Sequence, residues 1–547
     1  LKERFNYIMI DKYQDTNEIQ YNIFLPLVNY LKDNNFFVVG DEKQSIYMFR
    51  DAELEVFRKT RENIQRETDN RGARELEESF RMSPSLALFT NHLFSNLMDN
   101  PIPEFNRVAY SNIVCARSDN EPGTIEIILA DNMQKELNNP QVSEIRMIAK
   151  RLKQLKHSTD SLNYRDIALL CRKRKIFPVI EKVFTDENIP YSILGGEGFY
   201  QRQTVYDIYN YLSFLVNKDD VPLVGLLRSP FFNLSDSSIL EISLTELPDP
   251  PSSPVSLWKR LVHSADQSKT FDKIVKILSE NIQVAETYDI PSLIRKIIEE
   301  GDFLSVIAAR KNGNVEVQNL EKLIKDAEVF VSNGYRLLYD YTEFLRDAIE
   351  TKTDEGLVSP GDDSDTVKIL TIHMAKGMQY KAVFVINMDE VPQQTVTKAK
   401  SVAIAKNTGL LMKIPHSGNY SKDYVSPPIL RTYDYIQKEK EIAESVRLFY
   451  VAVTRAENFL FLSGVISDKP FKKNSFFSFL CNGLNMPLIQ PKIAVSGKLK
   501  KALVHDGKFV SFEEDMTVEI PVLKTVDYAE AEADPVPVIE KPVDIKV

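Results

Sequence analysis

The sequence predicts an α/β protein whose parallel sheets are interrupted by an all-helical segment. Short, continuous apolar runs bounded by polar residues recur along the chain, for example at 36–39 and 167–171, and such runs are typical of parallel strands buried on both faces. Residues 216–365 instead show helical spacing with few strand candidates. With 547 residues, 43% of them hydrophobic, the chain can bury several cores, and we expect about three or four globular units.

Changes in this pattern divide the chain into five segments. They are a first α/β lobe, the beginning of a second α/β lobe, a helical insertion, the remainder of the second lobe and a C-terminal extension: 1–75, 76–215, 216–365, 366–470 and 471–547. An all-helical segment between strands of one lobe is typical of an inserted subdomain. Residues 517–547 are rich in Glu, Asp, Ala, Val and Pro, so we predict an acidic linker or tail there.

Local periodicity gives the elements in order. In the first lobe we expect buried strands at 7–10 and 36–39, and a charged helix at 57–74. The second lobe should contain a helix at 142–155 and a set of strands: 124–129, 167–171, 367–371, 382–387 and 459–463.

Residues 447–456, Arg-Leu-Phe-Tyr-Val-Ala-Val-Thr-Arg-Ala, combine an apolar run with two arginines. We interpret this run as a buried strand that brings Arg447 and Arg455 to one place. A guanidinium group stays charged at any working pH and its planar fork matches phosphate oxygens, so the segment favours phosphate recognition. This segment alone is equally consistent with a core strand that has no role in phosphate binding. In that case the arginines would bury their aliphatic stems and extend their charged ends to solvent.

The two strands of the first lobe each lead into polar residues. Asp11 follows the run 7–10, at the carboxyl end of a parallel strand, where α/β sheets hold their ligands. Its carboxylate suits Mg²⁺, bound directly or through water. The run 36–39 opens into a loop with Gln44, whose side chain could touch a γ-phosphate.

The same loop continues with Tyr47, Phe49 and Arg50. Aromatic rings and guanidinium planes stack on the bases of single-stranded nucleic acid. Packing of these rings in a core is the alternative interpretation.

Two further segments carry suitable chemistry. Phe80 and Arg81 place an aromatic ring beside a cation, which suits a purine and its phosphates. Residues 367–380 read as a strand that leads into a small basic loop with His373 and Lys376.

These five segments, taken in order, resemble motifs II, III, IV, V and VI of superfamily 1A helicases of the UvrD/Rep type. Five matches in the right order over roughly 450 residues make chance coincidence negligible. Residues 195–200 and 226–236 are similar to the AddA/RecB branch of helicase–nucleases. The resemblance implies P-loop NTPase (RecA-like) lobes, ATP and Mg²⁺ as cofactors, and single-stranded DNA as substrate.

The resemblance also implies roles for individual residues in the nucleotide site. Asp11 would coordinate Mg²⁺, and Gln44 would sense the γ-phosphate. Phe80 would stack on adenine. Arg81 and Arg455 would reach the γ-phosphate from the second lobe and stabilise the charge of phosphoryl transfer.

For DNA, the resemblance implies that Tyr47 and Phe49 stack on bases, with Arg50 beside them. His373 and Lys376 would lie near DNA or near the interface between the lobes.

Two positions depart from the family pattern, and a third has two interpretations. Lys12 stands where the family has the Glu that activates the attacking water; a protonated lysine cannot act as general base, so hydrolysis should be crippled. Whether Lys12 instead attracts phosphate stays open. Gln379 replaces a Glu thought to meet the ribose, and its amide can still bond a hydroxyl. Arg172 follows the strand 167–171 and could neutralise the DNA backbone, although a solvated basic turn is an equal alternative.

No G-x-x-x-x-G-K-[ST] loop occurs in the sequence, so no glycine-rich nest holds the β-phosphate. The sequence also begins almost directly before a strand. We therefore expect a fragment of an ATP-dependent DNA helicase of repair or recombination, cut inside the first lobe and unable to hydrolyse ATP. Tight binding of ATP or Mg²⁺ to this fragment alone is not expected. Residues 527–529, Asp-Tyr-Ala, lack the lysine of a nuclease signature, so the fragment should end before any nuclease domain.

Two alternatives to a motor fragment stay open. The chain could be a catalytically inactive, helicase-like module that docks DNA or a partner protein. It could also be one component of a helicase whose phosphate loop comes from another chain. A glycine-rich loop ahead of this sequence would favour the motor.

Charge and cysteines limit the remaining classes. The formal net charge is −10, but residues 511–547 hold ten acidic and three basic side chains, which is −7 of that total and leaves about −3 for the rest. Three distant cysteines argue against a disulfide scaffold or a zinc site and favour a cytoplasmic location. No apolar run of 18 residues suggests a membrane span. The resemblance implies a possible second helicase–nuclease subunit of the AddB/RecC type.

Overall fold

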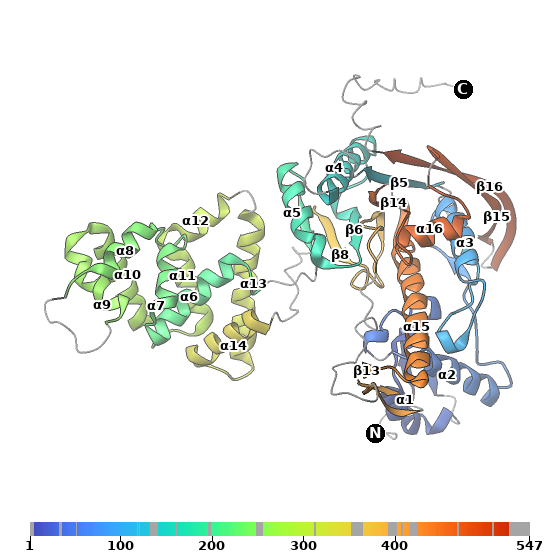
Figure 1. Cartoon of the computed structure of the whole chain (residues 1–547), viewed down its shortest axis with the longest axis horizontal. Helices are drawn as coiled ribbons and strands as arrows, with labels where there is room; N and C mark the ends of the chain where they lie inside the picture. The colour runs from blue at the N-terminus through green and yellow to red at the C-terminus, as the bar shows by residue number, and fades with distance from the viewer. Residues whose placement is uncertain are drawn as a thin grey trace, which may run out of the picture. The chain divides into compact units, whose positions relative to one another are not determined.

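The computed structural model shows a protein of mixed α/β architecture (Figure 1). The residues that the structure describes are 5–31, 35–50, 52–117, 119, 121–131, 140–159, 161–194, 199–247, 255–310, 313–351, 365–391, 402–405, 408–415, 424–467, 470–488, 490–505 and 508–524. Residues 195–198, part of the AddA-like segment, therefore lie outside the described residues.

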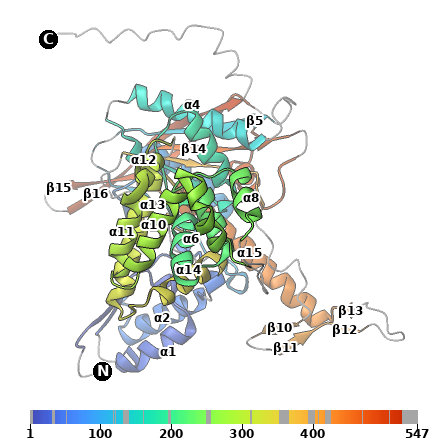
Figure 2. The ribbon, with the colours of Figure 1, turned by 90° about the vertical axis from the view of Figure 1, so that its left-hand side faces the viewer.

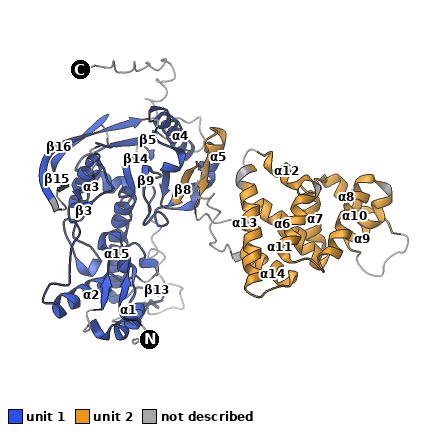
Figure 3. Ribbon diagram, turned by 180° about the vertical axis from the view of Figure 1, so that it is seen from behind, with its two compact units in different colours: residues 1–183, 371–547 blue, residues 184–370 orange. Residues whose placement is uncertain are grey.

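The chain forms two compact units (Figure 3). The first consists of residues 1–183 and 371–547, and the second of residues 184–370. The domain boundaries predicted at residues 75, 215, 365 and 470 stay predictions.

The first unit begins with a small parallel sheet. Strands β1 (Ile8–Ile10) and β2 (Phe36–Val38) pair in parallel, as predicted. Helices α1 (Glu18–Leu27) and α2 (Leu54–Glu67) flank them, and α2 accounts for most of the predicted charged helix. A core of Tyr13, Tyr21 and Val56 forms on one side of the sheet.

The prediction that these two strands are buried on both faces is wrong for the described residues. Met9 is 75% exposed and Phe37 is 59% exposed. Ile10, Phe36 and Val38 instead pack on the tyrosine core. An apolar run indicates a strand, but only the layers packed around a sheet decide which faces are covered.

The same unit contains a larger sheet. Its strands lie in the order β3-β4-β15-β16-β5-β14-β9-β6, and all neighbours pair in parallel except the hairpin of β15 and β16. The strands are β3 (Glu78–Ser79), β4 (Val114–Cys115), β5 (Thr124–Asp131), β6 (Ile167–Cys171), β9 (Tyr380–Val385), β14 (Ala456–Ile466), β15 (Lys492–His505) and β16 (Lys508–Lys524). The strands predicted within 124–129, 167–171, 382–387 and 459–463 are confirmed.

The prediction of a linker from residue 517 onward is wrong for residues 517–524. These residues belong to β16, which pairs with β15 and, through Val522 and its neighbours, with β5. Val518, Ile520 and Val522 are buried and alternate with exposed or half-buried positions, which is a strand pattern. The acidic composition of the segment concealed this alternation. Residues 525–547 lie outside the described residues.

Helices cover this sheet and lead into its strands. They are α3 (Pro84–Leu97), α4 (Pro140–Ser158), α15 (Pro428–Val453) and α16 (Phe476–Leu484). Helix α4 contains the helix predicted at 142–155. Helix α5 (Phe177–Asp186) follows β6.

The prediction of a strand at 447–456 is wrong. Residues 447–453 form the last turns of α15, a helix of 26 residues, and β14 starts only at Ala456. The apolar side chains from Leu448 to Val453 are buried all around the helix. A helix end buried on every side shows no amphipathic period, so a short apolar run cannot distinguish it from a strand.

Two small hairpins lie near the N-terminal end of α15 (Figure 2). They are formed by β10 (Val402–Ala405) with β11 (Gly409–Met412) and by β12 (Ile414–Pro415) with β13 (Tyr424–Val425). One face of the first hairpin packs on α15 through Leu411 and Leu430.

The second unit is mainly helical, which confirms the helical prediction for the described part of 216–365. Its helices are α6 (Gln203–Asn217), α7 (Asp220–Arg228), α8 (Asp236–Leu244), α9 (Leu257–Ser264), α10 (Lys269–Val284), α11 (Ile290–Glu299), α12 (Phe303–Ala308), α13 (Gly313–Ser332) and α14 (Leu338–Thr351). Strands β7 (Tyr191–Ile193) and β8 (Val367–Thr371) pair in parallel, which confirms the strand predicted at 367–371. Helix α6 packs against α7, α13 and α14.

The helical unit has an aromatic core. Phe231 and Phe303 stack with their ring centroids 3.8 Å apart, and Tyr211 meets Phe231 edge to face. Across the described parts of the chain, every helix is too short or too polar to cross a bilayer.

Candidate functional site

The acidic side of the site lies at the ends of β1 and β2. Because the two strands are parallel neighbours, the loops that follow them start at the same edge. Asp11 follows β1, is exposed, and accepts a hydrogen bond from the backbone N–H of Lys12 (2.8 Å). Asp41 lies in the loop after β2.

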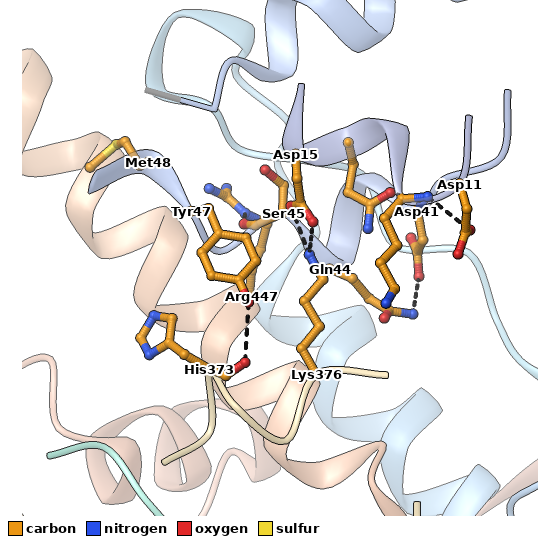
Figure 4. A network of polar contacts seen from close by, with 12 residues as sticks. Asp11, Asp15, Asp41, Gln44, Ser45, Tyr47, Met48, His373, Lys376 and Arg447 are labelled. Carbon is orange, nitrogen blue, oxygen red and sulfur yellow. Dashed lines mark hydrogen bonds and ion pairs between the residues drawn. The ribbon is translucent and has the colours of Figure 1, made fainter. Parts of the chain in front are cut away.

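Asp41 orients the side chain of Gln44. The amide Nε2 of Gln44 donates to Oδ2 of Asp41 at 3.1 Å (Figure 4). The backbone N–H of Asp41 in turn donates to Oε1 of Gln14 at 3.2 Å. A Cβ atom on Gly40 would lie 2.6 Å from that same Oε1 and 2.7 Å from Cε2 of Phe57, so a larger residue would displace these side chains.

Lys12 lies against the loop of 371–380. Its backbone has a positive φ of 54°, and its Nζ lies 3.3 Å from the position that a Cβ on Gly377 would occupy. Gly377 itself has φ +87°. The position where the resemblance implies a carboxylate therefore presents a cation to the basic loop.

An ion pair joins the first lobe to this loop. Lys376 donates to Oδ1 of Asp15 at 2.7 Å, across 361 residues of sequence (Figure 4). The Lys376 side chain is only 4% exposed. Burial raises the pKa of Asp15 and lowers the pKa of Lys376, although each partner opposes the shift of the other. Removing either partner would thus leave a desolvated charge without its counter-ion.

Four of the predicted DNA-contacting residues are brought together at this pair: Tyr47, Phe49, His373 and Lys376. The Nζ of Lys376 lies 4.8 Å from the ring centroid of Tyr47. The Tyr47 hydroxyl donates to the backbone oxygen of His373 (3.2 Å), and Phe49 meets the His373 ring edge to face. Phe49 is 65% exposed. The side chain of Arg50 lies outside the described residues.

The cationic side of the site comes from the second lobe. Arg81 donates from Nε to Oε1 of Gln379 (2.8 Å) and from Nη1 to the backbone oxygen of Thr454 (3.2 Å). Arg455 donates to the backbone oxygens of Val451 (2.9 Å) and Met378 (3.1 Å).

The two arginines are electrostatically coupled. Burial, together with the neighbouring charge of Arg81, lowers the pKa of Arg455 to about 10. Burial also lowers the pKa of Arg81. Asp41 acts on Arg455 in the opposite direction, so acidic and cationic sides lie within range of each other's charge. An anion between these groups would relieve the repulsion between the arginines.

Phe80 precedes Arg81 and is 59% exposed. Gln379 is exposed and bonded to Arg81. The hydrogen bond between Arg81 and Gln379 thus joins two residues that were predicted to bind the nucleotide. Phe80, the third, directly precedes Arg81 in the chain.

Arg447 has different partners from Arg455. Its Nε donates to the backbone oxygen of Ser45 (2.7 Å) and its Nη1 to that of Asn106 (2.6 Å). The residue is 2% exposed, and burial lowers its pKa to about 10. Its predicted contact with the nucleotide stays a prediction, while the observed bonds hold the loop before Tyr47.

Arg172 also packs against α15. Its Nη2 donates to Oγ of Ser445 (2.7 Å), its guanidinium lies 5.1 Å from the ring centroid of Phe476, and burial lowers its pKa to about 10. These contacts contradict a solvated basic turn. Its predicted contact with DNA stays a prediction.

Sequence reasoning missed three acidic residues of the site: Asp15, Asp41 and Glu444. Oε1 of Glu444 accepts the backbone N–H of Met48 at 2.8 Å. Asp15 and Asp41 stood within motif segments but received no role. Glu444 stands three residues before Arg447, so the two side chains share one face of a helix. This spacing could have indicated Glu444, but the prediction of a strand at 447–456 concealed it.

Comparisons with known proteins identify the family of the chain. The family model of the UvrD-like helicase C-terminal domain matches residues 75–466, and that of the UvrD/REP helicase N-terminal domain matches residues 1–65. The chain therefore belongs to the UvrD-like helicase family.

Curated relatives define the branch. The chain is 29% identical over 559 residues to an ATP-dependent helicase/nuclease subunit from Lactobacillus acidophilus, covering 97% of this chain and 45% of the relative. It is 28% identical over 511 residues to a protein of the same name and to the exonuclease/helicase subunit RexA, both of Streptococcus pneumoniae; each match covers 87% of this chain and 41% of the relative. The chain thus spans less than half the length of these relatives.

Proposed function

We propose that this chain forms the ATP- and DNA-facing region of a helicase that moves along single-stranded DNA in repair or recombination. The observation that carries the proposal is the meeting of two sets of groups from distant parts of the sequence. Asp41 and Gln44 follow a strand of the first lobe. Arg455 comes from the second lobe within range of the Asp41 charge, and the charge of Arg81 acts on Arg455 in turn.

ATP and Mg²⁺ fit the residues present. Within the described residues no cluster of three or more His, Cys, Asp or Glu side chains could hold a metal alone. Mg²⁺, however, is usually held by one or two carboxylates together with substrate phosphates, and the exposed Asp11 suits that role. Phe80 would stack on adenine, Gln379 would bond the ribose, and Arg81 and Arg455 would stabilise charge on the γ-phosphate.

Lys12 defines the expected activity of this chain. Its ammonium group lies beside Gly377 and its charge acts on both Asp15 and Lys376. A cation there can attract phosphate, but it cannot take a proton from water. We expect nucleotide hydrolysis by this sequence to be very slow.

Single-stranded DNA would bind at the aromatic loop of residues 45–50. The exposed ring of Phe49 offers a stacking face, Tyr47 lies beside it, and Lys376 supplies positive charge. The relatives are named as subunits, so we also propose a second helicase–nuclease subunit, of the AddB/RecC type, as partner.

Binding of oligo-dT by this chain tests the proposal. We expect affinity that falls with salt, because lysines and arginines release counter-ions from phosphate. Affinity should also fall when the bases are replaced by abasic sites, because stacking is lost. Fluorescence anisotropy measures both effects. Absence of binding to oligo-dT at low salt would overturn the proposal.

A second function is favoured by one observation. Lys12 occupies the position of the family's catalytic Glu, as in a helicase-like module that only docks DNA or a partner. A longer form of the protein that carries a phosphate-binding loop separates the two functions. Its Lys12→Glu variant should hydrolyse ATP if the chain is a motor, and should stay inactive if it is a docking module.

A further inference from the structure

Helix α15 holds the backbone of the aromatic loop at two points. Oε1 of Glu444 accepts the N–H of Met48 (2.8 Å), and Nε of Arg447 donates to the carbonyl of Ser45 (2.7 Å). These two bonds bracket Tyr47; Figure 4 shows Tyr47 with Ser45, Met48 and Arg447. An acceptor and a donor three residues apart on one helix therefore fix both ends of the segment that leads to Phe49.

Glu444 is itself held in place by its surroundings. Burial raises the pKa of this carboxylate, while the Met48 N–H and the charges of Arg447 and Arg172 lower it. Arg172 is tied to the same helix through Ser445. The Glu444 carboxylate therefore restricts the position of the Met48 N–H. If this hydrogen bond were broken, both groups would stay desolvated without a partner, which costs free energy.

The same helix reaches the cationic side of the nucleotide site. Arg455 follows the end of α15 and donates from Nε to the carbonyl of Val451, inside its last turn. Arg81 donates to the carbonyl of Thr454, directly after the helix. A displacement of this helix end would therefore be transmitted to Glu444 through continuous helical hydrogen bonds.

We propose that Glu444 is a positioning residue for DNA binding, which fixes the stacking rings of Tyr47 and Phe49 through the N–H of Met48. This inference rests on the proposed function. The contact couples the aromatic loop to α15, so the orientation of the rings follows the helix that also carries the arginines of the nucleotide site. The coupling element is one continuous helix rather than a diffuse network.

Three variants of the chain test this role. Glu444→Ala removes the acceptor, and Glu444→Gln keeps an acceptor oxygen but removes the charge. Glu439→Ala is the matched control, because Glu439 lies on the same helix and pairs with Arg107 at the partly exposed surface (2.7 Å). Circular dichroism and thermal unfolding verify that each variant is folded.

The measurement compares two DNA strands of equal length, oligo-dT and an abasic strand. The ratio of their dissociation constants isolates the contribution of base stacking from that of phosphate contacts. We expect Glu444→Ala to weaken oligo-dT binding about tenfold, a loss within the range of one stacked base, and to leave abasic binding unchanged. Glu444→Gln should stay within about threefold of the wild type because a neutral acceptor preserves the bond. Glu439→Ala should change neither constant by more than about twofold.

The outcomes separate this inference from the proposed function. If the wild-type chain does not prefer oligo-dT over the abasic strand, stacking itself is absent and the proposed function fails. If the wild type shows this preference and folded Glu444→Ala retains it, the positioning role is overturned while the proposed function stands. An equal loss on both strands, or a loss in Glu444→Gln as large as in Glu444→Ala, would also overturn it.

Discussion

The two lobes of the first unit hold their parts of the site by different means. In the second lobe, the strands β9 and β14 behind Arg455 are buried, with Phe384 and Phe461 stacked 4.2 Å apart. In the first lobe, β1 and β2 behind Asp11 have exposed side chains such as Met9 and Phe37. The arginines therefore rest on a close-packed scaffold, whereas the acids depend on hydrogen bonds of short loops.

This difference indicates which residues should affect stability and which should affect ligand binding. A close-packed layer transmits strain, so changes inside the second-lobe sheet should alter stability. The first-lobe loops are tied by local polar contacts such as the hydrogen bond from Gln44 to Asp41. Changes there should alter ligand binding with smaller effects on folding. Four predictions test this contrast, from the largest expected effect to the smallest.

The first prediction concerns Arg455. In a longer form of the protein that carries a phosphate loop, and with Lys12→Glu in the background, Arg455→Ala should lower ATP turnover by roughly 10³-fold or more, as loss of an arginine at the γ-phosphate does elsewhere. Its affinity for single-stranded DNA should change little. Steady-state ATPase and anisotropy assays measure the two effects. Equal loss of both would show that Arg455 contacts DNA or only maintains the fold.

The second prediction concerns Lys12. In the same longer form, Lys12→Glu should raise ATP turnover by about 10²–10⁴-fold, the usual contribution of a general base. Lys12→Gln serves as the control, because it removes the cation without supplying a base. If Gln raised turnover as much as Glu, the lysine would act by charge alone and its position would not be that of the catalytic base.

The third prediction concerns Phe49 in the first lobe. Phe49→Ala should weaken oligo-dT binding by about 1–3 kcal/mol if its ring stacks on one base, without a change in the unfolding temperature. Leu410→Ala is a matched control, because Leu410 is similarly exposed, at 58% against 65%, on the β10–β11 hairpin. Unchanged affinity in Phe49→Ala would favour a packing role for this ring.

The fourth prediction concerns Glu144 on α4, a buried acid of the second lobe. Its Oε1 accepts the N–H of Asn387 (2.8 Å) and the hydroxyl of Ser463 (2.7 Å), and burial raises its pKa to about 7. Because the pKa of Glu144 is higher in the folded than in the unfolded state, its contribution to the free energy of unfolding is full below the unfolded-state pKa. This contribution is lost as the pH rises through about 7. Glu144→Gln should remove this decline.

We therefore expect Glu144→Gln to be more stable than the wild type at pH 8.5, on the order of 1–2 kcal/mol, and to gain nothing at pH 4. Urea unfolding at both pH values measures the difference. An equal gain or loss at the two pH values would show that packing, rather than ionisation, determines the effect of this residue.

Much of the site was predictable because its chemistry is local. Asp11 and Gln44 each follow a strand signalled by an apolar run, and the pairing of β1 with β2 brings the two loops to one edge. The aromatic and cationic residues of the loops at 45–50 and 371–380 were also identified from their types and order. The structure brings Tyr47, Phe49, His373 and Lys376 into contact.

Other features could not be predicted from neighbours in sequence. The ion pair between Asp15 and Lys376 joins residues 361 positions apart, and Glu444 meets Met48 across 396 positions. The run after Arg447 was misassigned as a strand because a helix buried on all sides has no polar stripe. Tertiary packing overrides local pattern in each of these cases.

The sequence by itself determined the class of this protein: α/β lobes, a helical insertion, and an ordered set of residues suited to phosphate, magnesium and bases. It determined these because strand runs, helical spacing and residue chemistry are properties of short segments. Only the tertiary structure decided which backbone groups the two arginines of motif VI bind: Arg447 holds the carbonyl of Ser45 in the aromatic loop, and Arg455 holds the carbonyl of Met378. That choice depends on how α15 packs between the lobes, and such packing is set by contacts between segments hundreds of residues apart.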